Sequence, residues 1–181
     1  QRWCAGPVGL LIVLLAGGSW GHRREPGQPV KRPLFLLAVV VAQAAFGMWT
    51  VTLKLWPQVV TGHLLGGFAT LSLLFLLTLR LSGVLPALIV PKRLQYWATA
   101  GLVLVIGQIA LGGWVSSNYA AVACTDLPVC EEGWQDRLDF DEAFIFWGHE
   151  HDKPDYEFGV LDNDARTTIH VMHRFGALLV T

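Results

Sequence analysis

The sequence predicts an all-α fold: a polytopic helical bundle that lies in a membrane. Hydrophobic residues make up 53% of the 181 residues, charged residues make up only 15%, and the mean hydropathy is +0.47. Soluble domains have about a quarter of their residues charged. The apolar residues also gather in long runs, which is typical of membrane-spanning helices. These observations exclude an ordinary soluble domain.

Four long apolar runs and the start of a fifth follow one another along the chain, at 3–20, 33–53, 59–81, 94–116 and 168–181. A hydrocarbon core of about 30 Å needs about 20 helical residues, which the middle three runs supply. The first and last runs look cut at the chain ends. The first run also resembles the apolar part of a signal peptide, but this interpretation is less favoured because a basic leader and a small-residue cleavage site are missing. We therefore expect about four spans and the start of a fifth.

Charge placement predicts the orientation of these spans. Basic residues gather in the segments 21–32 and 80–93, which the positive-inside rule assigns to the cytoplasm. The segment 118–165 contains thirteen carboxylates but only Arg137 and Lys153 as basic residues. We therefore expect a multi-pass protein of the bacterial inner (cytoplasmic) membrane, with loop 118–165 on the extracytoplasmic side. Four tryptophans fall near the expected interfaces and are interpreted as anchors: Trp49, Trp56, Trp97 and Trp114.

Two histidines lie inside apolar runs, each followed by a glycine at the third position. His63 precedes Gly66, and His173 precedes Gly176. An imidazole in hydrocarbon costs free energy unless it is coordinated or hydrogen-bonded, so an ionisable group at this depth is a functional candidate. We expect haem iron as the partner of both histidines. The alternative is that they hydrogen-bond across helices in a structural or assembly subunit.

A short pattern recurs in two of the runs. Gln-x-Ala-x-Gly-x-Trp begins at Gln43 and again 65 residues later at Gln108. Small residues allow close approach of helices or leave room for a flat ligand, and a glutamine at membrane depth is expected to hydrogen-bond within a bundle. Helix packing alone would explain the repeat. The functional interpretation is that each copy lines a cofactor pocket beside the next histidine-bearing helix, Gln43 with His63 and Gln108 with His173.

Two cysteines flank a five-residue, proline-containing turn in the outer loop. Cys124 and Cys130 can form a disulfide in an oxidising compartment, and we favour this over a free thiol pair or a chance spacing. Cys4, in the first apolar run, is interpreted as a packing residue.

The outer loop also contains His149, Glu150 and His151 in an acidic stretch. These residue types bind divalent metals. Solvation is the favoured interpretation, because no second ligand group with suitable spacing accompanies them.

Several segments together resemble the haem A synthase family of cytochrome oxidase assembly proteins. The segment 107–121 reads GQIALGGWVSSNYAA, and CTDLPVC follows at 124–130. The segment 169–177, IHVMHRFGA, resembles the His-Arg helix start of that family, and 43–67 resembles its third and fourth helices. The cysteine loop coupled to a downstream His-Arg helix is the most specific of these features.

The resemblance implies a fold and a reaction. Members of the family have eight membrane helices in two similar four-helix halves, each of which holds haem between paired histidines. They oxidise the methyl group of haem O to the formyl group of haem A. The implied cofactor is haem b, and haem O is the substrate. By this resemblance the chain spans helices two to six: residues 1–82 belong to the N-terminal half, 83–93 form a cytoplasmic connection, and 94–181 start the C-terminal half.

The resemblance also assigns roles to single residues. His63 matches the histidine partner of the first half, and His173 matches the sixth-helix ligand. Gln1 falls where the family has its second-helix histidine. His170 occupies a glutamate position, where it either contacts substrate or a haem propionate, or is a hydrated residue at the helix start. Arg174 is expected to pair with a propionate or with lipid phosphate.

Partners and alternatives follow from these assignments. We expect membrane lipid, and haem O synthase or cytochrome oxidase assembly factors, as partners, and no nucleic acid. The fragment itself is expected to be inactive. A membrane b-type cytochrome that only relays electrons, and a non-catalytic assembly subunit, remain the alternatives.

Overall fold

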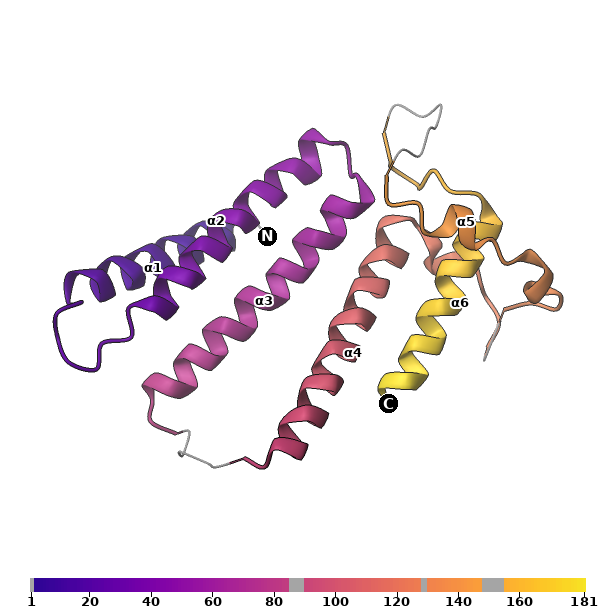
Figure 1. Cartoon of the computed structure of the whole chain (residues 1–181). Coiled ribbons are helices and arrows are strands. Elements are labelled where there is room, and N and C mark those ends of the chain that lie inside the picture. The colour runs from indigo at the N-terminus through magenta and orange to yellow at the C-terminus, as the bar shows by residue number, and fades with distance from the viewer. Residues whose placement is uncertain (1, 85–89, 128–129, 148–154) are drawn as a thin grey trace. The chain divides into compact units, whose positions relative to one another are not determined.

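The computed structural model describes residues 2–84, 90–127, 130–147 and 155–181, and within the first helix it describes side chains from residue 5 onwards. The predicted all-α class is confirmed: helices alternate with turns, and the described residues contain no strand. The elements are α1 (Arg2–Gly21), α2 (Lys31–Thr52), α3 (Pro57–Leu81), α4 (Lys92–Ser117), the 3-10 turns η1 (Ala120–Val122) and η2 (Trp134–Arg137), α5 (Phe140–Ala143) and α6 (Asn163–Val180) (Figure 1).

Three helices, α2, α3 and α4, are long and apolar enough to cross a membrane. The apolar part of α1, Ala5–Gly21, is shorter. Large apolar side chains project outward from these helices; Val41, Leu71 and Phe75 are each more than 60% exposed. Such a surface is costly in water and suits contact with lipid tails.

The chain divides into two compact units, each of which we describe by itself. The first consists of residues 1–45 and 66–87. Its core joins α1, α2 and α3 through Ile12, Leu36 and Leu77, which are at most 5% exposed. The second consists of residues 46–65 and 88–181. The predicted division at 1–82 and 94–181 follows family topology rather than contacts, and it stays a prediction.

In the second unit, α4 packs against two other helices through neighbouring glycines. A β-carbon on Gly113 would lie 3.1 Å from Thr61 and Leu64 of α3. Thr61 Oγ1 also lies 3.5 Å from Ser117 Oγ of α4. On its other side, α4 contacts α6 (Figure 1). The small residues therefore let helices approach closely, as expected for packing in a membrane.

The turn between α2 and α3 precedes the helix that carries His63 and contacts the outer loop. Lys54 and Leu55 both adopt left-handed backbone angles, with φ of 52° and 66°. The Leu55 amide donates to the Thr50 carbonyl at 2.9 Å and closes the end of α2. The Tyr156 amide donates to the Lys54 carbonyl at 3.1 Å. The turn is thus tied to a segment of the outer loop about a hundred residues away.

The described parts of the outer segment, 118–127, 130–147 and 155–165, pack over the ends of α4 and α6. Its cluster of buried residues contains Trp114, Ala120, Ala143, Leu161 and Ile169. The Trp114 indole N–H donates to the Ala143 carbonyl at 2.9 Å, and Trp114 is only 6% exposed. The interpretation of Trp114 as a lipid anchor is therefore wrong, because its ring lies in a protein core. Trp97, at 60% exposure, has the open surface expected of an anchor.

Helix α6 begins at Asn163, five residues before the predicted apolar run. Its first turns are polar but buried under the outer segment: Thr167 and Thr168 are fully buried. The Arg137 guanidinium pairs with Asp164 at 3.1 Å and donates to Thr167 Oγ1 at 3.0 Å. Hydropathy indicated where α6 becomes apolar, whereas these contacts stabilise an earlier start.

Candidate functional site

The centre of the candidate site is His173, half-buried on α6 and facing α4. The Gln108 side-chain amide lies 3.0 Å from His173 Nδ1 and donates to the His173 carbonyl at 2.9 Å. With the amide nitrogen as donor, Nδ1 is the acceptor of the ring. The other ring nitrogen, Nε2, makes no hydrogen bond within the described part of the chain. Gln108 therefore orients the imidazole and leaves Nε2 for another ligand.

Two glycines leave room for the His173 imidazole and the Gln108 amide. A β-carbon on Gly112 would lie 3.1 Å from His173 Cε1, so the ring lies directly on the α4 backbone. A β-carbon on Gly176 would overlap Gln108 Oε1. That oxygen is buried and accepts no hydrogen bond from the described residues. Both glycines thus belong to the site through their lack of a side chain.

The same two contacts recur at the first histidine-bearing helix. A β-carbon on Gly47 would lie 3.1 Å from Cε1 of His63. A β-carbon on Gly66 would overlap Oε1 of Gln43. Gly47 and Gly112 occupy the same position of the repeated pattern, and Gly66 and Gly176 both follow a histidine by three residues. The structure therefore places each copy of the pattern against the helix that carries the next histidine.

His170 and Arg174 lie one turn apart on α6 and bind each other. His170 Nδ1 donates to the Ala120 carbonyl at 2.8 Å, because a carbonyl can only accept. His170 Nε2 then accepts from Arg174 Nε at 2.9 Å. Arg174 also donates to the carbonyls of Asp126, at 2.6 Å, and Cys124, at 3.2 Å. Arg174 thus fastens the cysteine loop to α6, and His170 fastens the turn at Ala120 that precedes it. The sequence did not indicate these roles.

The predicted disulfide is present. Cys124 and Cys130 are bonded, with Cα atoms 4.8 Å apart. Both cysteines are buried against Val171 of α6, with Trp134 packed beside them. Glu131 accepts hydrogen bonds from the Thr125 amide at 3.3 Å and the Thr125 hydroxyl at 2.9 Å. Bonds from its own backbone and from Thr125 lower the pKa of the Glu131 carboxyl.

The site residues fall into separate groups. Gln108, His173, His170 and Arg174 come together at α4, α6 and the cysteine loop. Gln43 meets Gly66, and His63 meets Gly47. Gln1 and the His149-Glu150-His151 stretch lie outside the described residues. Within the described ranges, no group of three or more His, Cys, Asp or Glu side chains is placed to hold a metal ion.

Sequence reasoning missed two kinds of contributor. The sequence motifs contain Gly112 and Gly176, but only the structure shows their contacts with a ring and an amide. The carbonyls of Ala120, Cys124 and Asp126 carry no sequence signal at all, because every residue has one. The spacing of His170 and Arg174, one helical turn apart, was the available signal for their mutual contact.

Comparison with known proteins gives two matches. Residues 1–181 match the family described as cytochrome oxidase assembly protein. The chain is 48% identical over 185 aligned positions to a heme A synthase of Shewanella oneidensis, and the alignment covers 99% of this chain and 53% of that relative. The chain therefore spans about half the length of the curated relative that it matches. No solved structure matches it.

Proposed function

Because this chain belongs to the cytochrome oxidase assembly protein family, we propose that it is part of a haem A synthase, an oxidoreductase that converts the methyl group of haem O into the formyl group of haem A. The family that the sequence motifs predicted is confirmed by the match over the whole chain. The relative that carries this name is about twice as long. The activity, its substrate and its partners are therefore proposed for the whole protein.

The observation that carries the proposal beyond family membership is the duplicated contact of a glycine with a histidine ring. Gly47 receives His63 and Gly112 receives His173, at the same 3.1 Å from a β-carbon placed on each glycine. Packing alone does not require an imidazole at both places, and an apolar side chain would fit a lipid-facing bundle at lower cost. The repeated imidazoles support one ligand of haem iron in each half.

The donor chemistry at His173 fits an iron ligand. Imidazole nitrogen is a common axial ligand of haem, and a hydrogen bond on the other ring nitrogen usually fixes its tautomer. Coordination through Nε2 leaves the proton on Nδ1. A half-turn of the Gln108 amide then presents Oε1, the oxygen that accepts no hydrogen bond from the described residues, to that proton. Bound haem b supplies the redox chemistry, and Gln108 sets the orientation and basicity of its ligand.

His170 and Arg174 are proposed to act mainly through the cysteine loop. Their side-chain nitrogens bind each other and the carbonyls of Ala120, Cys124 and Asp126. The haem propionate and the lipid phosphate, which the sequence indicated as partners of Arg174, stay predictions. The segment fastened in this way is held to α6 at His170 and Arg174, three residues before and one residue after His173.

The proposed setting follows the charges of the sequence. Helices α2, α3 and α4 cross the bacterial inner membrane, and the acidic segment 118–165 faces outward. The disulfide between Cys124 and Cys130 is consistent with an oxidising compartment on that side. Membrane lipid, haem O synthase and cytochrome oxidase assembly factors are the proposed partners.

The test of this function uses the full-length protein in membranes that contain haem O. The extracted haems are separated and identified by mass for the parent, for His173→Ala and for His22→Ala. His22 is the matched control, since it is exposed just after the end of α1 and its ring hydrogen-bonds to the Gly18 carbonyl, at 2.9 Å. We expect haem A from the parent and from His22→Ala, and little from His173→Ala. Unchanged haem A in His173→Ala would refute the site, and bound haem without haem A in the parent would favour the electron-relay cytochrome.

A further inference from the structure

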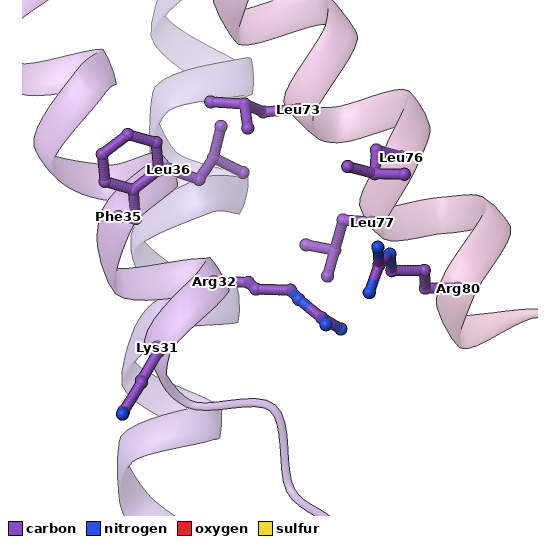
Figure 2. A pocket seen from close by; sticks show the side chains of 8 residues that line it. All are labelled: Lys31, Arg32, Phe35, Leu36, Leu73, Leu76, Leu77 and Arg80. Carbon is purple, nitrogen blue, oxygen red and sulfur yellow. The ribbon is translucent and has the colours of Figure 1, made fainter. Parts of the chain in front are cut away.

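A second site lies in the first unit, at the opposite end of α2 and α3 from their connecting turn. A cavity of about 230 Å³ opens there, lined by eight residues (Figure 2): Lys31, Arg32, Phe35, Leu36, Leu73, Leu76, Leu77 and Arg80. Its inner wall is part of the unit's core, because Leu36 and Leu77 are the buried residues that join α2 and α3. The cavity is thus an apolar groove between two packed helices with cations at its mouth.

Among the residues that the structure describes, the cations at the mouth have no acidic partner. Figure 2 shows the guanidinium groups of Arg32 and Arg80 reaching toward each other from α2 and α3. No carboxylate of the described residues lies within salt-bridge distance of either group. The sequence explains this: the unit has six lysines and arginines but a single carboxylate, Glu25. Two guanidiniums that converge without a counter-ion repel each other, and an anion between them removes that repulsion.

The groove also needs an apolar occupant. Phe35 is 59% exposed and Leu76 is 40% exposed beside the two arginines. Exposure of this apolar surface to water is unfavourable, and an acyl chain that covers it removes that cost. The volume is below the roughly 300 Å³ at which pockets for drug-sized ligands begin, so a whole porphyrin is too large for it. A phosphate group attached to an acyl chain combines the negative charge and the apolar surface that the groove requires.

We propose that this groove binds an anionic phospholipid, with its phosphate between Arg32 and Arg80 and an acyl chain along Phe35, Leu73 and Leu76. The positive-inside rule assigns this end of α2 and α3 to the cytoplasm, and basic pockets between membrane helices on that side are typical sites for anionic head groups. Lys31 strengthens the local field, although its side chain points away from the arginine pair (Figure 2). The site is independent of the histidines and of the proposed reaction.

The experiment measures lipid binding by native mass spectrometry of the full-length protein in detergent. The delipidated protein is titrated with dioleoyl phosphatidylglycerol and, separately, with dioleoyl phosphatidylcholine. We expect the parent to bind one phosphatidylglycerol more tightly than phosphatidylcholine. Arg32→Gln with Arg80→Gln should weaken that binding about thirtyfold, since two basic residues near a membrane surface contribute about 1 kcal/mol each. Arg32→Lys with Arg80→Lys keeps both charges and should keep the preference for phosphatidylglycerol.

The matched control removes the same charge from the same unit. The control is the double variant Arg23→Gln with Arg24→Gln. Both residues lie outside the groove, and the Arg23 guanidinium donates to the Trp20 carbonyl and lies 5.0 Å from the centre of the Trp20 ring. This variant should leave phosphatidylglycerol binding within a factor of about two of the parent. Equal weakening in both double variants, or equal affinity of the parent for the two lipids, would overturn the proposal. Displacement of the lipid by millimolar inorganic phosphate would overturn it as well, since the groove would then recognise the free anion.

Discussion

Gly47 and Gly112 receive a histidine ring from the next helix in the same way, yet the segments that lead into the two histidine-bearing helices differ. The helix that carries His173 is fastened by Arg174 to a loop that a disulfide closes. The segment that leads into His63 is a short turn with two left-handed residues, Lys54 and Leu55. The repeated pattern therefore determines the contact between each histidine ring and its glycine. The outer segment adds a fixed start for α6.

The largest effect is expected from variants that remove the feature shared by both sites, the glycine against which each histidine ring lies. Gly112→Leu places a side chain where the His173 ring lies, and Gly47→Leu does the same to His63. Overpacking of this kind typically costs 1–3 kcal/mol, so each variant should lower the unfolding temperature of the full-length protein in detergent. The control is Gly107→Leu on α4, where a side chain meets nothing within 4 Å. Equal unfolding temperatures for Gly112→Leu and Gly107→Leu would show that the ring does not depend on this glycine.

Removal of the disulfide is expected to affect the helix that carries His173 and to leave the helix that carries His63 unchanged. Cys124→Ser with Cys130→Ser should destabilise the outer segment by about 2 kcal/mol, because a short closed loop loses its cross-link. Hydrogen exchange should become faster at the start of α6, while α2 and the start of α3 keep the exchange rates of the parent. If exchange quickened equally at His63 and at His173, the loop would not be specific to the second site.

A smaller effect is expected from Arg174→Lys. An ammonium group keeps the charge but cannot reproduce the fork that reaches His170 and two carbonyls. The loss of these bonds should cost about 1–2 kcal/mol and be seen as earlier proteolysis within the cysteine loop. Arg93→Lys, at the exposed start of α4, is the control and should be cleaved like the parent. Parent-like proteolysis of Arg174→Lys would remove the fastening role.

The smallest effect is a pH dependence confined to the cysteine loop. The pKa of Glu131 is lowered in the folded loop by hydrogen bonds from its own backbone and from Thr125. A lowered folded pKa means that this contribution is present above the unfolded value of 4.5 and is lost as the pH falls through the folded value. Glu131→Gln should therefore flatten the pH dependence of hydrogen exchange at Thr125 below pH 5 or so. An unchanged profile would show that another group controls the loop.

Hydropathy predicted the long helices of both units well. The runs 33–53, 59–81 and 94–116 correspond to α2, α3 and α4 within two residues at each end. These helices are determined by local composition, because a backbone in lipid has to satisfy its own hydrogen bonds. The disulfide was predictable for a similar reason, since six positions of separation keep the two thiols close in any compact turn.

The folded outer segment was not predictable in the same way. Its contacts join residues far apart in the sequence, such as Trp114 with Ala143 and Arg137 with Thr167. The early start of α6 depends on them, because polar Thr167 and Thr168 are buried only when that segment packs over them. At the site, the sequence pattern was sufficient to identify the candidate histidines and glutamines. Their partners were glycines and carbonyls, whose roles follow only from position.

The most direct test of the duplicated histidine site is the haem spectrum of the purified full-length protein. Optical and electron paramagnetic resonance spectra are recorded for the parent, His63→Ala, His173→Ala and the control His22→Ala, with haem counted per polypeptide. Our account predicts that each of the first two substitutions removes or shifts a different haem signal and leaves the other as in the parent. Spectra and haem content identical to the parent in both variants would contradict it.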